Sequence, residues 1–82
     1  MEIVWDERKR LANIEKHGLD FADLTLEFFQ GASIRTAKLG RLQAIGRHMD
    51  GKISVIFATL GAEGISVISM RPAELRERKL IE

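Results

Sequence analysis

The spacing of apolar residues changes abruptly near Gly31, and this change constrains the fold more than any other feature of the sequence. Before Gly31, Phe21, Leu24 and Phe28 recur with the spacing of a helix that buries one face. After it, short stretches rich in β-branched residues alternate with glycine-containing turns, which is typical of strands. The sequence therefore predicts an α+β fold in which most of the sheet follows the helices.

Two helices and one short strand are predicted ahead of this sheet. Residues 3–5 resemble a strand, and Asp6 is a good N-cap for a helix that ends at Gly18. Asp20 is predicted to start a second helix that runs to Gly31. Because the apolar face of this second helix is wide, we expect it to be the most buried one.

Four further strands and a final helix complete the predicted order, β-α-α-β-β-β-β-α, in a single domain that spans residues 1–82. Asp50-Gly51 is typical of a two-residue hairpin turn of type I′. Pro72 fits the first position of the final helix. The predicted strands cover residues 33–37, 41–49, 52–60 and 65–70.

The composition excludes several classes of protein. Cysteine is absent, so neither a disulfide framework nor a cysteine-based zinc site is expected. No apolar run approaches about 18 residues, and the first residues lack the pattern of a signal peptide, so we expect a cytoplasmic protein without a membrane segment. The spacing of His, Asp and Glu is not that of a metal centre, and no glycine-rich phosphate loop occurs, so neither a metal nor a cofactor is expected.

The charge is unevenly distributed, although the formal net charge is only +1. Residues 1–30 hold four basic and seven acidic residues, whereas residues 31–53 hold five basic residues, Arg41 among them, and one acidic residue. A basic middle segment favours binding of a polyanion. The alternative is a sheet edge that lysine and arginine protect from aggregation.

The predicted turns bring two arginines close together. The hairpin turn predicted above places Arg47 opposite Ser54, and a next turn closed by Leu60 opposite Ile65 places Ser54 opposite Arg71. Two guanidinium groups on either side of a small serine would form a pocket for a phosphate. This prediction depends on strand register, because a slip of one residue would turn Arg71 to the other face.

A series of short motifs extends over nearly the whole chain: Trp5-Asp6, Asn13 with Lys16-His17-Gly18 and Phe21, Phe28-Phe29, Ala44-Ile45-Gly46-Arg47, Asp50-Gly51, Ile68-Ser69-Met70-Arg71 and Glu77-Arg78. In this order, the series resembles the BrnT family of type II toxin–antitoxin ribonucleases. The resemblance implies a RelE-like α+β fold, in which a small antiparallel sheet carries two N-terminal helices and one C-terminal helix. It also implies cleavage of RNA without a metal ion, which would inhibit translation.

The same resemblance implies a partner, a BrnA-like antitoxin with a ribbon-helix-helix domain. The toxin would reach operator DNA only through this antitoxin.

Two departures from the family pattern stand out. Met70 replaces the usual alanine, and Leu80-Ile81 stand where an aromatic residue is usual. The chain has no tyrosine, which excludes a tyrosine general base. These departures keep a second hypothesis open, a non-catalytic RNA- or protein-binding module of RelE-like fold.

Metal-independent cleavage of RNA needs proton transfer and cations near the phosphate. His17 lies beside Lys16 in the last turn of the first predicted helix, where both could act on a phosphate or simply complete the helix end. Arg47 and Arg71 are the predicted phosphate contacts. His48 could take part in proton transfer, although we favour the alternative that it is an exposed residue at a strand end.

The remaining candidates are less specific. Arg76 and Arg78 on the final helix, together with Arg41 and Ser54, are predicted to contact RNA; for the helix, contact with the antitoxin or a solvated face are alternatives. Glu77 could act as a base, although a role in pairing within its helix is favoured. Trp5 could stack on a nucleobase, although packing against the helices is favoured.

Overall fold

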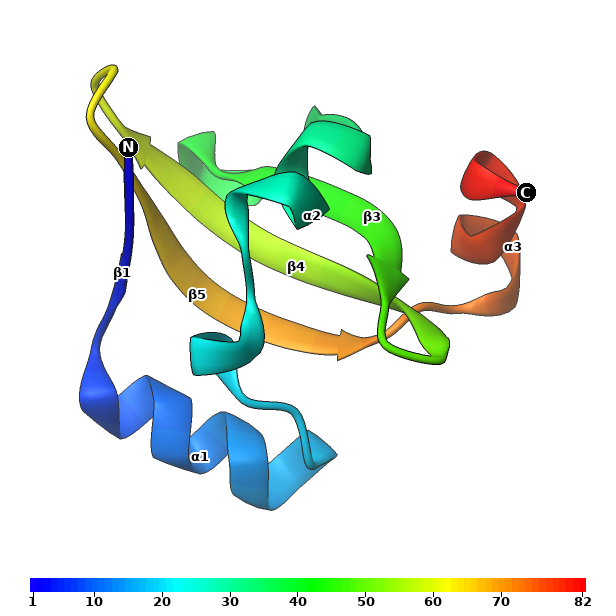
Figure 1. The fold of residues 1–82 in the computed structure, drawn as a ribbon, viewed down its shortest axis with the longest axis horizontal. Helices are drawn as coiled ribbons and strands as arrows, with labels where there is room; N and C mark the ends of the chain where they lie inside the picture. The colour runs from blue at the N-terminus through cyan, green and yellow to red at the C-terminus, as the bar shows by residue number, and fades with distance from the viewer.

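A five-stranded sheet with the strand order β1-β5-β4-β3-β2 forms the centre of the molecule in the computed structural model, which describes residues 1–82 (Figure 1). Its ladders are antiparallel except at one edge, where β1 runs parallel to β5. The α+β fold and the predicted order of elements are confirmed, and the sheet is mixed rather than purely antiparallel. The strands are β1 (Glu2–Trp5), β2 (Ser33–Thr36), β3 (Leu42–His48), β4 (Gly51–Leu60) and β5 (Gly64–Pro72).

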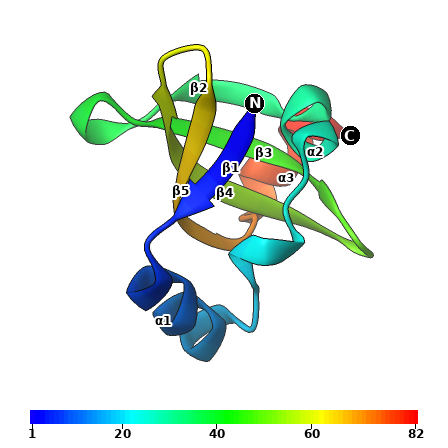
Figure 2. The ribbon, with the colours of Figure 1, turned by 60° about the vertical axis from the view of Figure 1, so that its left-hand side comes forward.

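The first helix, α1 (Glu7–His17), follows the prediction at both ends. The side chain of Asp6 accepts a hydrogen bond from the backbone N–H of Arg8, and Gly18 ends the helix in the left-handed conformation, with φ of 70°. Figure 2 shows α1 at one end of the molecule, apart from α2 and α3. None of the helices combines the length and the apolar character needed to span a bilayer.

The second predicted helix is divided into two short pieces, η1 (Phe21–Asp23) and α2 (Leu26–Gly31). Leu24 and Thr25 are extended between them, and the Thr25 hydroxyl accepts a hydrogen bond from the N–H of Phe28, which begins α2 anew. The break lets both pieces direct aromatic rings into the core. Phe21 is completely buried, and Phe28 and Phe29 are almost so.

The core lies between these helical segments and one face of the sheet. Alternate residues of the strands point into it, among them Ala44, Val55 and Met70, each with no exposed surface. Gly46 lets the backbone of β3 approach the ring of Phe28 closely, because a Cβ atom at this position would lie 2.8 Å from Cε1 of Phe28. The glycine of the Ile-Gly-Arg motif is therefore required by packing between α2 and β3.

The β3–β4 hairpin corrects one predicted register. Its turn consists of Met49 and Asp50, so His48 faces Gly51 and Arg47 faces Lys52. Met49 takes a positive φ of 54°, which closes the turn one residue earlier than predicted. The predicted pairing of Arg47 with Ser54 is therefore wrong.

The β4–β5 hairpin confirms the other predicted pair, Ser54 opposite Arg71. Its turn closes with Leu60 opposite Gly64 instead of Ile65, and a bulge between Ile56 and Phe57 restores the predicted pairing beyond it.

The C-terminal helix, α3 (Leu75–Arg78), is followed by the short 3-10 helix η3 (Lys79–Ile81). It begins later than predicted, because β5 extends to Pro72. Its Glu77 accepts a hydrogen bond from Gln43, which also donates to Ser54. Gln43 and Ser54 point away from the face that holds Ala44 and Val55. Thus α3 covers part of the face that α1 and α2 leave open.

Candidate active site

A groove of about 410 Å³ between α1 and β5 gathers basic side chains from two distant parts of the sequence. It brings together three of the four predicted catalytic residues, Lys16 and His17 from α1 and Arg71 from β5. Lys9 adds a further cationic side chain, since it lies on the same side of α1. The other lining residues are Ala12, Asn13, Ile68, Ser69 and Met70.

Asn13 fixes α1 against the sheet beside this groove. Its Oδ1 accepts a hydrogen bond of 3.1 Å from the N–H of Met70, and its Nδ2 donates one of 3.0 Å to the carbonyl of Leu19. Because β1 ends opposite Val67, no strand pairs with Met70 on that side of β5, and the asparagine takes the place of a strand there, while β4 pairs with Met70 on the other side. Asn13 is buried, so both bonds are protected from water. They hold Lys16 and His17 in position relative to Arg71.

An ion pair restrains the loop that follows α1. The guanidinium of Arg10 donates two hydrogen bonds to the carboxylate of Asp20, at 2.8 and 3.0 Å, and a third to Glu7. The bonds from Arg10 lower the pKa of Asp20 below its ordinary value. Since the loop begins directly after His17, this clamp also limits where the histidine can move.

Arg71 is held from behind by Glu77 of α3. Its Nη1 and Nη2 donate to Oε1 and Oε2 of Glu77 at 2.8 and 2.9 Å, and Glu77 is only 4% exposed. The Nε–H of Arg71 makes no hydrogen bond within the protein. One edge of the guanidinium thus serves the fold while its other edge stays available.

The same carboxylate accepts bonds from two further groups. Nε2 of Gln43 lies 2.9 Å from Glu77 and also donates to the hydroxyl of Ser54, and the backbone N–H of Glu74 donates to the carboxylate as part of a capping box. These donors and Arg71 lower the pKa of Glu77 to about 2. Glu77 would therefore be a poor base. Its observed role is structural, since it pairs with Arg71 and caps α3.

The predicted phosphate pocket between Arg47 and Arg71 is thus replaced by an internal carboxylate. Ser54 is only 1% exposed and accepts a hydrogen bond from Gln43, so its side chain is engaged inside the protein, and its predicted contact with RNA stays a prediction. Sequence reasoning missed Gln43 and Arg35, whose guanidinium bonds to Gln43 and lies 3.6 Å from Glu77. The alternation of Gln43 with the core residue Ala44 on β3 was the available signal for Gln43.

Arg47 lies apart from the groove, near the β3–β4 turn, and its Nη2 donates to the carbonyl of Ile81 at 3.0 Å. Arg47 and Arg78 line one small pocket beside this turn. Arg76 is exposed on α3, and Arg41 is partly exposed just before β3. The structure therefore separates these predicted RNA contacts from Lys16 and His17.

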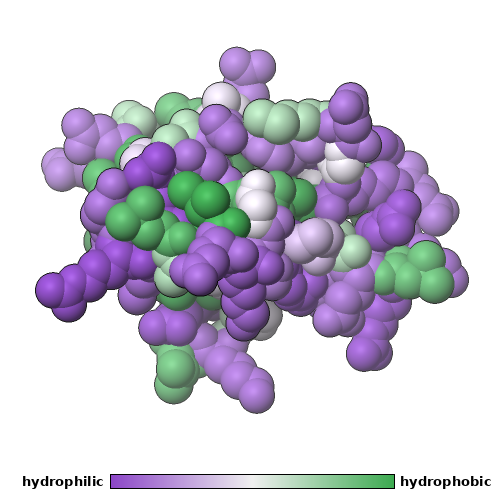
Figure 3. Space-filling view, turned by 90° about the horizontal axis from the view of Figure 1, so that it is seen from below, coloured by the Kyte–Doolittle hydropathy of each residue, from purple (hydrophilic) through white to green (hydrophobic).

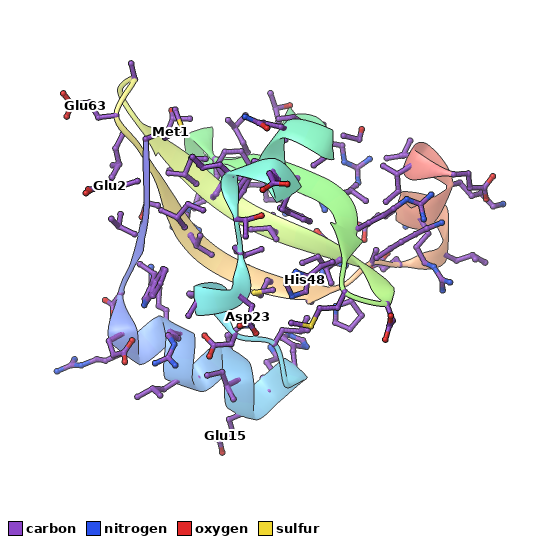
Figure 4. All side chains as sticks on the ribbon, viewed as in Figure 1. Met1, Glu2, Glu15, Asp23, His48 and Glu63 are labelled. Carbon is purple, nitrogen blue, oxygen red and sulfur yellow. The ribbon has the colours of Figure 1, made fainter.

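Neither of the two weaker candidates enters the groove. His48 lies beside the β3–β4 turn, where its ring packs edge-on against Phe28 with centroids 6.4 Å apart (Figure 4). Trp5 is half-buried against the core and donates from Nε1 to Glu7. His17 is thus the histidine of the candidate site.

The face of the molecule on the α1 side is mostly hydrophilic, with separate hydrophobic patches (Figure 3). Glu15 points from α1 away from the sheet, so it lies on the far side of the helix from the groove (Figure 4). A polar, basic groove on such a face suits a charged and hydrated ligand better than an apolar one.

Residues 5–77 match the family model described as the ribonuclease toxin BrnT of type II toxin–antitoxin systems. The chain belongs to the BrnT family. It is also similar to the crystal structure of the Brucella abortus ribonuclease toxin, BrnT, with 55% sequence identity and a TM-score of 0.86 over 90% of this chain and 97% of that one. Comparison with curated proteins gives no match.

As a member of the BrnT family, the protein is a ribonuclease toxin of a type II toxin–antitoxin system, with RNA as its substrate and an antitoxin as its partner. Of its two departures from the family pattern, Met70 lines the groove and Leu80-Ile81 lie away from it. The side chain of Met70 is completely buried in the core, and Ile81 lines a pocket beside Phe28 and Arg47.

Proposed function

We propose that this BrnT toxin cleaves RNA without a metal ion in the groove between α1 and β5. The observation that carries the proposal is the meeting of Lys16 and His17 with Arg71 in one basic groove. Cations that are fixed before the substrate arrives can stabilise charge that develops on a phosphate. They would supply the role that a metal ion has in other nucleases.

The proposed reaction is an internal transfer at one phosphodiester. The 2′-oxygen of the RNA attacks the neighbouring phosphorus and loses its proton, and the bond from phosphorus to the 5′-oxygen breaks. The departing 5′-oxygen gains a proton. The products are a 2′,3′-cyclic phosphate and a 5′-hydroxyl end.

Each groove residue has a role in this proposal. His17 moves a proton at the 2′- or the 5′-oxygen, because it is the only imidazole of the groove and imidazole is the most common general acid and base in enzymes. Arg71 donates its free Nε–H to the phosphate, and Lys16 and Lys9 add positive charge. The ion pair with Glu77 keeps Arg71 from folding back over the groove.

The experiment uses the purified protein and RNA in the presence of a chelator. Wild-type protein should release 2′,3′-cyclic phosphate ends, and His17→Ala should slow cleavage about 10²–10⁴-fold. His48→Ala is the matched control and should retain cleavage, since His48 lies outside the groove. Arg71→Ala should lose cleavage, with the exposed Arg8→Ala as its control.

Cleavage that disappears with the chelator and returns with a divalent cation would overturn metal independence. A folded wild-type protein that binds RNA but leaves it intact would favour the alternative of a non-catalytic module. Full activity of His17→Ala would remove the proton-transfer role from His17.

We also propose that the antitoxin is BrnA-like, with a ribbon-helix-helix domain, and that toxin and substrate meet in the cytoplasm. Family membership supports a protein antitoxin as partner. Co-expression with the neighbouring gene should restore growth that the toxin alone arrests. In a gel-shift assay, the complex should bind operator DNA and the toxin alone should not.

A further inference from the structure

Three basic side chains surround a small pocket beside the β3–β4 turn. Arg47 and Lys52 lie directly opposite each other on neighbouring strands, and Arg78 of α3 lines the same pocket of about 160 Å³. Like charges that face each other across a strand pair destabilise a sheet. The stability of the fold therefore does not explain why these basic side chains lie together.

None of these three cations has a carboxylate within ion-pair distance, and the ion pairs of the molecule involve only Arg10, Arg35 and Arg71 among its basic residues. Asp50 lines the pocket without pairing with any of the three. The one hydrogen bond that the side chain of Arg47 makes within the protein is to the neutral carbonyl of Ile81. The positive charge of the pocket is thus left to a ligand from outside.

On the same face of the sheet, Arg35 and Arg71 share the buried carboxylate of Glu77, which is an internal counter-ion. The pocket beside the turn contains one more cation than that cluster and has no paired carboxylate. Glu77 thus neutralises the cluster of Arg35 and Arg71, whereas the cations beside the β3–β4 turn have no counter-ion in the protein.

The pocket also lies close to the proposed cleavage groove. Ser54 faces Arg71 across the β4–β5 ladder, and Lys52 is two residues before Ser54 on the same side of β4. Two residues along a strand span about 7 Å. Lys52 is therefore offset from Arg71 by about 7 Å along the strands and by one strand spacing of about 5 Å across them, so one RNA strand can reach both.

We propose that Arg47, Lys52 and Arg78 form a second phosphate site, which binds the RNA strand on one side of the cleaved bond. This inference rests on the proposed function, because it concerns the same substrate in the neighbouring groove. Apart from Met49, the pocket has no apolar side chain in its lining, which favours a phosphate over a protein surface. The site would hold longer RNA than the groove alone can hold.

The test measures binding of single-stranded 2′-O-methyl RNA, which cannot undergo the internal attack, over a series of salt concentrations. For Lys52→Gln with Arg78→Gln, the slope of log affinity against log salt should fall by about 1.4, because each lost phosphate contact on a single strand removes about 0.7. At about 0.1 M salt the same change corresponds to a roughly 25-fold weaker affinity. Arg47 is left unchanged because its bond to Ile81 also supports the fold.

Two further variants complete the experiment. Arg8→Gln with Lys38→Gln removes the same charge at exposed positions outside both sites, and its slope should change much less. Lys52→Arg with Arg78→Lys keeps the charge and should keep the slope. A 2′-O-methyl dinucleotide, which is too short to reach the second site, should lose less affinity than the longer strand.

Equal slopes for the site variant and its charge control would overturn the second phosphate site. Loss of antitoxin binding with an unchanged RNA slope would do the same and would assign this surface to the antitoxin. Because the probe is not cleaved, wild-type protein that binds the strand in the expected way yet fails to cleave natural RNA would overturn only the proposed function.

Discussion

The carboxylate of Glu77 receives both arms of the Arg71 guanidinium, at 2.8 and 2.9 Å, inside a helix of four residues. A helix this short is unstable on its own in water. The pair therefore does two things at once: it attaches α3 to the sheet, and it orients the arginine that lines the candidate active site. Stability and the proposed activity are therefore coupled through this pair.

This coupling predicts a loss of stability in acid. The bonds from Arg71 lower the pKa of Glu77 from an ordinary value of 4.5 to about 2, so the stabilisation is complete above pH 4.5 and disappears as the pH falls towards 2. The free energy of unfolding should decrease by up to about 3 kcal/mol from this group. Urea unfolding between about pH 6 and about pH 2 measures it, and Glu77→Gln should show a shallower decrease than wild type.

Arg71→Lys should separate charge from geometry. Lysine keeps the positive charge but cannot make two parallel bonds to Glu77. We expect cleavage to fall at least about tenfold, because the cation is no longer fixed beside the groove. Cleavage assays together with urea unfolding check this, and wild-type rates in the lysine variant would show that the orientation of Arg71 is unimportant.

Asn13→Ala should loosen the groove without touching any basic residue. The N–H of Met70 would lose its acceptor in a buried position, which costs about 1–3 kcal/mol of stability. Hydrogen exchange of the Met70 amide should accelerate relative to its neighbours in β5. Asn13→Asp keeps an acceptor for Met70, so retained protection of that amide would support the assignment.

Gly46→Ala should destabilise the packing of α2 against β3. The new methyl group would lie 2.8 Å from Phe28 and 3.2 Å from Cβ of Ala32, so the ring or the strand must move. We expect a loss of about 1–3 kcal/mol, measured by thermal or urea unfolding. Gly31→Ala is the control, since a Cβ atom there meets nothing within 4 Å, and an equal loss in both variants would contradict the packing argument.

The order of elements could be predicted from sequence because it depends on local signals. Asp6 and Gly18 bound α1 as expected, and the change of apolar spacing at Gly31 separates helices from strands. The break at Thr25 was missed, since the apolar pattern continues through it.

Strand register was harder to predict for a specific physical reason. Moving the β3–β4 turn by one residue shifts the pairing by two positions, and every side chain stays on its own face of the sheet. Both registers bury Ala44 and Val55, so the hydrophobic pattern could not choose between them. The prediction of Arg47 opposite Ser54 failed on this point, whereas the bulge before Phe57 preserved Ser54 opposite Arg71.

The site was predicted in part. Lys16, His17 and Arg71 were identified as residues and meet in one groove, but their roles stay predictions. The partner of Arg71 was missed, because Glu77 reaches it through the docking of α3, which no local pattern specifies. Local rules indicate which groups can form ion pairs, and tertiary packing decides which of them do.

The parallel pairing of β1 with β5 joins the two ends of the sequence, Glu2–Trp5 with residues 64–67. The groove has the same origin, since α1 supplies one wall and Ser69 to Arg71 the other. During synthesis, neither can form until the ribosome has made the residues of β5 that complete them, Gly64 to Arg71. The candidate site is therefore assembled late, because α1 must wait for a strand that is made more than 40 residues after it.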